Sequence, residues 1–378
     1  MKCFNHSCQG ESHKASDKEC QDYSLTWQNE DKSITIAVVC DGHGGDSYFR
    51  SATGARFAAN ITVEQLHQFL ADVDTSLFAG QPFTALGTKE TRESESELDD
   101  VMRRLDNVMR RLFESIYARW RIAITEDGHR ALTEWEREHV EQKYIDLLED
   151  EDRIVKAYGC TLMVYVCTND YWFAFQLGDG KLVMLNEQSE FSQPVPWDER
   201  CFLNKTTSLC GREPVKDFRF CIQGDGSFPI AVFLGSDGLD DSYPDDNKLN
   251  SFYGSIVKEL ASKGQDEVEN MLKEDLPKIS KEGSKDDMSV AVVYDETKIA
   301  EAAKSINEYQ KRVLNDEINE IKKDILEKKS LIGKVRELES SIEKMQAEAR
   351  MAEKEIRRKE LEIEKLQERL HKLESFTL

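Results

Sequence analysis

The sequence has no long hydrophobic run and little proline. Its 378 residues include only seven prolines, and no window approaches the roughly 20 apolar residues that a membrane-spanning helix needs. The first residues, Met1 to Ser7, form no apolar stretch of signal-peptide length. We therefore expect a cytoplasmic protein with no membrane partner.

Positive charge is scarce as well. The 51 lysines and arginines face 73 acidic residues, which gives a formal net charge of -22 at pH 7. Because this excess repels polyanions, the composition argues against a nucleic-acid partner. The nine cysteines are an odd number, and several lie inside apolar runs, where a thiol behaves as a small hydrophobe. We expect no disulfide framework.

Residues 1–298 carry the signals of an α+β domain. Residues 1–85 alternate apolar runs with glycine and aspartate, which predicts strands joined by loops. A proline-free stretch rich in Glu, Arg and Leu, from about 89 to 156, predicts a helical insertion. Continuous apolar runs predict strands covered on both faces, and hence a double β-sheet sandwich flanked by helices. The clearest strands are residues 34–40, 161–167, 171–177, 231–234 and 289–294.

Residues 299–378 predict one long helix, with no proline and a single glycine, Gly333. From Leu331 to Leu373 the seam positions step alternately by four and three residues, with a phase slip near Lys328. A period of 3.5 predicts a left-handed coiled coil. The alternative is a solitary charged helix in solvent. We expect the seam to bind a second copy of the chain or a partner chain, without a defined strand direction.

Aspartates occur at the ends of several predicted strands. Three follow a strand and precede a glycine, and two precede the last strand. If the last strand runs antiparallel to the others, its beginning lies beside their ends, so that all five carboxylates meet at one edge of the sandwich. These aspartates are Asp41, Asp179, Asp237, Asp286 and Asp287.

Carboxylates brought this close repel one another unless cations neutralise them. Ligands that are all oxygen favour Mg²⁺ or Mn²⁺ over Zn²⁺. Two such ions lower the pKa of a shared water and stabilise a phosphoryl transition state, which predicts hydrolysis of a phosphate ester. For each Asp-Gly pair the alternative is an ordinary turn, and this is our interpretation of Asp225-Gly226.

The ensemble of motifs resembles the type 2C family of metal-dependent protein phosphatases. The N-terminal Ser12-His13 and Cys20-Gln-Asp22 resemble a bacterial branch of that family. The motifs cover residues 10 to 295, and their order makes the ensemble specific although each alone is weak. They are Asp41-Gly-His-Gly-Gly45, Gly159-Cys-Thr161, Gly178-Asp-Gly180, Ser236-Asp-Gly238 and Gly283-Ser-Lys-Asp-Asp-Met-Ser289.

The resemblance implies a double β-sheet sandwich with a dinuclear Mg²⁺ or Mn²⁺ site at one end of the sheets. Asp41 is implied to bridge both ions, and the carbonyl of Gly42 to bind one of them. Asp237 and Asp286 are implied to complete the other ion. Asp179, together with Asp237, is a candidate for a weaker third ion.

The resemblance also implies a phosphoserine or phosphothreonine protein as substrate, attacked directly by water without a phosphoenzyme. Asp22 is implied to orient the metal-bound water. His43 is implied to protonate the leaving alkoxide, a role that suits an imidazole.

Two departures from the family pattern stand out. Gln21 replaces a glutamate found in many members, and Asp17 stands near the place of a phosphate-binding arginine. Lys18, Lys14 and His13 are candidates for the phosphate contact instead. The departures keep a second hypothesis open, a weak pseudophosphatase that serves as a coiled-coil scaffold or binding module. The helical insertion is expected to cover the substrate groove or to form a docking surface.

Overall fold

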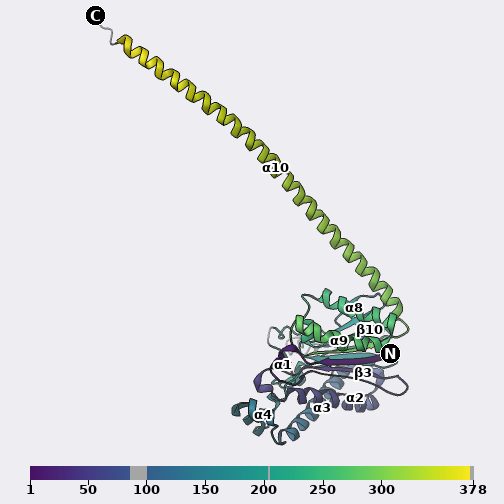
Figure 1. Ribbon diagram of the computed structural model, residues 1–378. Coiled ribbons are helices and arrows are strands. Elements are labelled where there is room, and N and C mark those ends of the chain that lie inside the picture. Colours follow the sequence, from purple (N-terminus) through teal and green to yellow (C-terminus); the bar gives the residue numbers. More distant parts are fainter. Residues whose placement is uncertain (86–99, 203–204, 375–378) are drawn as a thin grey trace. The chain divides into compact units, whose positions relative to one another are not determined.

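Figure 1 shows the computed structural model, which describes residues 1–85, 100–202 and 205–374. The chain divides into two compact units, Met1–Asn307 and Glu308–Leu378. The long helix α10 (Ile299–Glu374) begins in the first unit and continues through the second. The sequence-based boundary between residues 298 and 299, as a division between folding domains, stays a prediction.

The described part of the first unit contains two antiparallel sheets. One has five strands in the order β1-β11-β10-β7-β8, and the other has six in the order β2-β3-β5-β6-β9-β4. The last strand, β11, pairs antiparallel with β10, as the sequence predicted. The strands are β1 (Lys2–Cys8), β2 (Tyr23–Gln28), β3 (Thr35–Cys40), β4 (Gly80–Ala85), β5 (Leu162–Cys167), β6 (Trp172–Leu177), β7 (Lys181–Leu185), β8 (Phe191–Ser192), β9 (Arg219–Gly224), β10 (Ala231–Gly235) and β11 (Met288–Tyr294).

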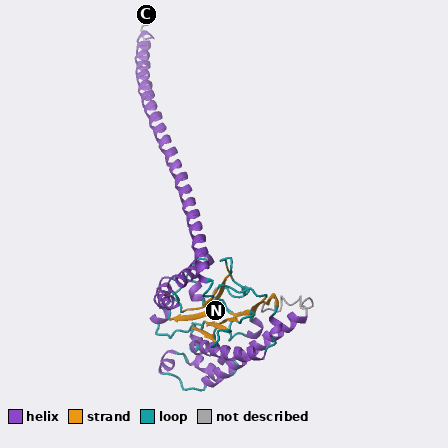
Figure 2. Ribbon diagram, turned by 90° about the vertical axis from the view of Figure 1, so that its right-hand side faces the viewer, coloured by secondary structure: helices purple, strands orange, loops and turns teal. Residues whose placement is uncertain are grey.

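Helices cover the outer faces of both sheets (Figures 1 and 2). α2 (Ser51–Asp72) and α3 (Asp100–Gly128) pack on the six-stranded sheet, and α8 (Asp246–Lys263) and α9 (Gln265–Glu282) pack on the five-stranded sheet. The α+β prediction of a double sandwich flanked by helices and followed by a long helix is confirmed. The shorter helices are α1 (Glu11–Ala15), α4 (Glu134–His139), α5 (Gln142–Ile145), α6 (Pro214–Asp217) and α7 (Asp237–Asp240).

The apolar runs of the strands are explained by burial on both faces. In β3, Ala37 and Val39 point into the layer between the sheets, whereas Ile36 and Val38 belong to the core beneath α2 and α3. All six residues of β3 are buried. Because successive side chains of a strand point to opposite faces, a strand covered on both sides must be apolar throughout.

The prediction of strands and loops throughout residues 1–85 is wrong for α2, a helix of 22 residues. Its buried face consists of small residues such as Ala55, Ala58 and Ala59. Gly54 fits so closely that a Cβ there would lie 2.0 Å from the carbonyl oxygen of Tyr158. Small residues give a weak amphipathic pattern, and only the close approach of the sheet explains why this segment is a buried helix.

The described part of the predicted insertion is helical and consists of α3, α4, α5 and short 3₁₀ turns. Residues 89–99 of that prediction lie outside the described residues. α3 presents one apolar face to the sheet, on which Phe113 stacks against Phe218 at 4.5 Å and Trp120 is fully buried. The Trp120 indole N–H donates to the Gly54 carbonyl at 3.0 Å, which ties α3 to α2.

The helix α10 changes character along its length. Ile299, Ala302 and Ile306 are buried in the core beneath α8 and α9. Beyond them the seam residues are exposed: Leu338 is 63% and Ile342 is 48% accessible. The side chain of Leu373, the last predicted seam position, is not described. No described helix, α10 included, is long and apolar enough to cross a membrane.

Candidate metal centre

Three of the predicted ligands meet at one edge of the sandwich. Asp41 directly follows β3, Asp179 follows β6, and Asp237 follows β10 in the other sheet. Each offers a carboxylate oxygen, and these oxygens all lie within 4.8 Å of one another. The two sheets therefore bring together, at one edge, carboxylates of residues that lie nearly 200 positions apart in the sequence.

The loops at these strand ends hold one another in place. The backbone N–H of Asp41 donates to Oγ1 of Thr161 at 3.0 Å, and the N–H of Thr161 donates back to the Asp41 carbonyl at 2.8 Å. Gly178, just before Asp179, has φ +123°, a conformation that favours glycine. A Cβ at Gly238 would lie 2.0 Å from the Asp287 carbonyl oxygen, so the loops after β10 and before β11 touch there.

Burial and mutual repulsion disfavour ionisation of these carboxyls. Burial, and then the neighbouring Asp237 and Asp22 carboxyls, raise the pKa of Asp41 well above its usual range. Burial raises the pKa of Asp237 to about 6 and also raises the pKa of Asp179. Burial, with the nearby Asp287 carboxylate, raises the pKa of Asp22 well above normal. Such a cluster ionises readily only when a cation compensates the repulsion.

The donor set fits a divalent metal ion that prefers oxygen ligands. Oδ1 of Asp179 and Oδ2 of Asp22 are buried, and neither has a hydrogen-bond partner among the described residues. A buried carboxylate oxygen without a donor is costly. Cation binding would satisfy these oxygens, and oxygen-only ligands suit Mg²⁺ or Mn²⁺.

Asp286 belongs to a neighbouring group with His13 and Asp287, whose ligand atoms also lie within 4.8 Å of one another. Asp286 is exposed, and its charge contributes to the raised pKa values of Asp22 and Asp237. It therefore lies close to the first group, although it is not among the three oxygens that converge there.

Asp287, the second of the two aspartates before the last strand, has an organising role that the sequence did not predict. It is 3% exposed. Its Oδ1 accepts from the Gly10 N–H at 2.6 Å, and its Oδ2 accepts from Nδ1 of His13 at 2.8 Å and from the Gln21 N–H at 2.5 Å. Burial opposes its ionisation, but the hydrogen bonds from His13 and the two backbone groups lower the pKa of Asp287. Asp287 thus fixes the segment that presents Asp22.

The sequence did not distinguish Asp286 from Asp287 as neighbours with different tasks. Thr161 belongs to one of the family motifs, but its hydrogen bonds with Asp41 were not predicted. Ser236 also supports the site, because its Oγ accepts from the Ser289 N–H at 2.9 Å and interacts with Asp22. The only sequence signal for Thr161 and Ser236 was a hydroxyl within a glycine-containing motif next to the end of a strand.

His43 and Gly42 lie on the loop that follows Asp41. Gly42 is buried and pairs with Cys160 in an isolated bridge. The backbone N–H of His43 donates to the Gly159 carbonyl at 3.1 Å, and its ring packs edge-on against Tyr48 at 4.8 Å. Burial lowers the pKa of His43 to about 4.

Two of the three candidate phosphate contacts, Lys18 and His13, differ in how firmly they are held, and the third, Lys14, is exposed. The Lys18 ammonium donates to the Gly44 carbonyl at 2.9 Å and lies 3.8 Å from Oδ1 of Asp46. His13 is buried, and its hydrogen bond to Asp287 raises its pKa, which favours the cationic imidazolium. Both cations adjoin the loop that begins at Asp41.

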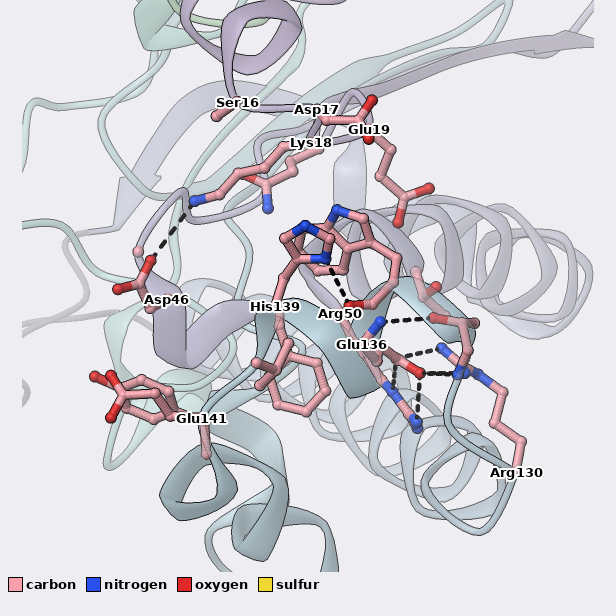
Figure 3. Close-up of a pocket in the computed structure, with 18 residues that line it drawn as sticks. Ser16, Asp17, Lys18, Glu19, Asp46, Arg50, Arg130, Glu136, His139 and Glu141 are labelled. Atoms are coloured by element: carbon pink, nitrogen blue, oxygen red, sulfur yellow. Dashed lines mark hydrogen bonds and ion pairs between the residues drawn. The ribbon is translucent and has the colours of Figure 1, made fainter.

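The loop after Asp41 leads into a buried ion pair with the helical insertion (Figure 3). Arg50 is 1% exposed, and it donates through Nε to Oε1 of Glu136 at 2.6 Å and through Nη1 to the Tyr158 hydroxyl at 2.7 Å. Arg130 makes two more hydrogen bonds to Glu136, each of 2.9 Å. Burial opposes ionisation of Glu136, but the bonds from Arg130 and Arg50 lower its pKa to about 2.

The chain is similar to several proteins of known structure. A bacterial serine phosphatase is 14% identical, with a TM-score of 0.44, over 78% of this chain and 99% of that one. The serine/threonine phosphatase Stp1 from Staphylococcus aureus is 15% identical, with a TM-score of 0.44, over 78% and 95%. A C. elegans sex determining protein is 14% identical, with a TM-score of 0.49, over 80% and 67%. No curated protein matches the chain.

A family model, described as protein phosphatase 2C, matches residues 9–276. The matched region begins at the residue after β1, ends inside α9, and includes Asp22, Asp41, Asp179 and Asp237. Because this match spans well over half of the chain, the protein belongs to the protein phosphatase 2C family.

Proposed function

We propose that the protein is a serine/threonine phosphoprotein phosphatase that hydrolyses phosphomonoesters with two bound Mg²⁺ or Mn²⁺ ions, and with a weaker third. The observation that carries this proposal is the convergence of the Asp41, Asp179 and Asp237 oxygens within 4.8 Å. Family membership supports the same reaction. The ions would supply charge neutralisation for the phosphoryl group and a water of lowered pKa.

The chain's own residues have distinct tasks in this proposal. Asp41 and the Gly42 carbonyl would hold the ions together with Asp237 and Asp286, and Asp179 with Asp237 would hold the third. Asp286, which is exposed and not among the three converging oxygens, would contribute its carboxylate from the neighbouring group.

Asp22 and His43 are proposed to handle protons. The Asp22 carboxylate accepts a hydrogen bond from the attacking water and so orients it. His43 protonates the leaving alkoxide, because a bound phosphate dianion nearby would raise the pKa of the imidazole from its low value. Lys18 and His13 are proposed to contact the phosphate, since both can carry positive charge next to the Gly44 carbonyl and Asp287.

The test is turnover of a phosphothreonine peptide by the full chain with Mn²⁺, with EDTA, and in the Asp41→Asn and Asp237→Asn variants. We expect turnover that requires Mn²⁺ and falls by about a hundredfold or more in both variants. The matched control is Asp225→Asn, which changes an exposed Asp-Gly turn and should keep wild-type turnover.

The alternative is a pseudophosphatase that binds phosphoproteins without turnover, favoured by the buried and unpaired side-chain oxygen of Gln21 in place of an ionised group. If the folded wild type shows no Mn²⁺-dependent turnover on several phosphopeptides and on a small aryl phosphate, the alternative replaces the phosphatase proposal.

The exposed seam of α10 supports a further element of the proposal, association with a second copy or with a partner chain. Ile342, Ile356 and Leu366 are each about half exposed or more along one helical stripe. A helix keeps such a stripe over many turns when another helix covers it. Sedimentation equilibrium of the full chain measures the self-association.

A further inference from the structure

A cavity of about 550 Å³ lies beside the candidate metal centre (Figure 3). Three chain segments line it: residues 16–21 after α1, residues 45–53 after the Asp41 loop, and residues 130–144 of the insertion. Gln21 precedes Asp22, and Gly45 lies two residues after His43, so the same loops wall both the cavity and the site. The volume is that of a pocket for a side chain and its flanking backbone.

The positively charged side chains that line this cavity already have partners within the chain. Arg50 and Arg130 both pair with the buried Glu136. Lys18 is occupied by the Gly44 carbonyl and by Asp46. Arg50 and Arg130 are therefore not left to attract an anionic ligand into the cavity, and the Lys18 ammonium points to the Gly44 carbonyl on the loop of the metal centre, where it is proposed to contact the phosphate.

The rim of the cavity is acidic. The lining contains three Lys or Arg side chains against five carboxylates, an excess of two negative charges. Figure 3 shows Asp17 and Glu19 together on one side and Glu141 on another. All three are exposed, and Glu141 also lies 2.9 Å from Lys143, an exposed ion pair that competes weakly. A ligand that enters here meets negative potential.

The remaining wall offers aromatic faces and an unsatisfied acceptor. Trp135 stacks with His139 at 5.1 Å, and Phe49 and Tyr144 line the same space. Gln21 is only 6% exposed, and its side-chain oxygen has no hydrogen-bond partner among the described residues. Aromatic faces attract a guanidinium or ammonium group. Such cations carry donors and no acceptor, so they suit a lining of carboxylates and a free carbonyl.

We propose that this cavity binds an arginine or lysine side chain of the phosphoprotein substrate, next to the residue that carries the phosphate. The inference rests on the proposed function, which makes a phosphopeptide the ligand of the adjoining site. The insertion supplies Trp135, His139 and Glu141, and it therefore sets which phosphoproteins are selected.

Binding without turnover tests the cavity independently of catalysis. The probes are fluorescent phosphothreonine peptides that differ only in carrying arginine, alanine or glutamate at each flanking position in turn. Their affinity for the full-length Asp41→Asn variant is measured by fluorescence anisotropy. We expect an arginine peptide to bind at least tenfold more tightly than its alanine counterpart, and a glutamate peptide to bind more weakly still.

The variant Asp17→Asn/Glu19→Gln/Glu141→Gln, made on the same Asp41→Asn background, should reduce the ratio of arginine to alanine affinity to about one. The matched control Glu30→Gln/Glu114→Gln/Asp170→Asn removes three exposed carboxylates that do not line the cavity, and it should keep the ratio. Circular dichroism of each variant confirms folding.

Equal affinity for the three peptides at every position, or a preference for arginine that survives the triple substitution, overturns the inference. Turnover of an aryl phosphate by the wild type decides the proposed function separately. A preference for arginine without any turnover would support the cavity as a binding site and contradict the phosphatase proposal. Turnover without the preference would support the phosphatase proposal and contradict the role of the cavity.

Discussion

The two units of the chain use apolar residues in opposite ways. In the first unit, Phe233 and Val292 are completely buried by the chain's own helices. In α10, Leu338 and Ile342 are 63% and 48% exposed although the helix is regular throughout. The first unit therefore gains hydrophobic free energy from contacts within the chain, whereas the stripe on α10 would gain it only if another helix covered it. The same residue types stabilise the fold in one place and are proposed to select a partner in the other.

The largest effect on this contrast is expected from Phe233→Ala. Phe233 is 0% exposed and stacks on Tyr253 at 4.5 Å. Its truncation leaves a cavity, and the free energy of unfolding of the first unit should fall by about 3–5 kcal/mol. Urea denaturation followed by tryptophan fluorescence measures the change. The exposed Phe202 is the control, because Phe202→Ala should cost less than about 0.5 kcal/mol. Similar losses in both variants would contradict the burial pattern.

A smaller loss is expected from Glu136→Gln, which removes the closer of the two carboxylates that pair with the buried Arg50 and leaves only Asp127. The free energy of unfolding at pH 7 should fall by about 3 kcal/mol. Chemical denaturation at several pH values measures it. The exposed Glu138 of the same helix provides the control Glu138→Gln, which should be silent.

The same variant has a defined pH dependence. The folded-state pKa of Glu136 is about 2, below its ordinary value. As the pH falls, the Glu136 carboxylate is therefore protonated first in the unfolded chain, at about pH 4.3. Above that pH the ion pair contributes fully to the free energy of unfolding. The contribution disappears as the pH falls from about 4.3 toward 2. A difference between wild type and Glu136→Gln that stays constant down to pH 2 would contradict the pairing.

Next in size is Ile342→Asp, which places a charge in the exposed seam of α10. Self-association or partner binding should weaken at least tenfold, about 1.4 kcal/mol, because a charge in the seam must be desolvated on pairing. The unfolding of the first unit should not change. Leu361 is exposed on the same helix but lies outside the seam, so Leu361→Asp is the control for sedimentation equilibrium. An equal effect of both substitutions would show that the seam is misassigned.

The smallest effect concerns the direction of pairing. Glu353 follows the seam residue Ala352. In a parallel dimer whose two helices are in register, Glu353 would face Glu348 of the second copy, and the two carboxylates would repel each other. Glu353→Lys should tighten such a dimer about threefold at low salt, because each like-charge pair becomes an opposite pair. Glu343→Lys makes the same charge change away from the seam and should have little effect. Weaker association of Glu353→Lys would exclude the parallel register.

Much of the fold follows from local sequence pattern. The runs that became β3, β5, β6, β10 and β11 are almost entirely apolar because both faces of each strand are covered. The carboxylates of Asp41, Asp179 and Asp237 could be foreseen as neighbours because each follows a strand end. The same reasoning failed for α2, whose alanine-rich face carries little amphipathic signal.

Local sequence pattern was enough to predict five of the sandwich strands, the long C-terminal helix, the family motifs and three of the carboxylates at one edge. Tertiary contacts determine that Asp287 is buried and hydrogen-bonded while the adjacent Asp286 is exposed. They also determine that Arg50 meets Glu136 and that an acidic cavity forms beside the site. These features depend on contacts between residues that lie tens to hundreds of positions apart in the sequence. No local pattern of charge or hydrophobicity encodes such contacts.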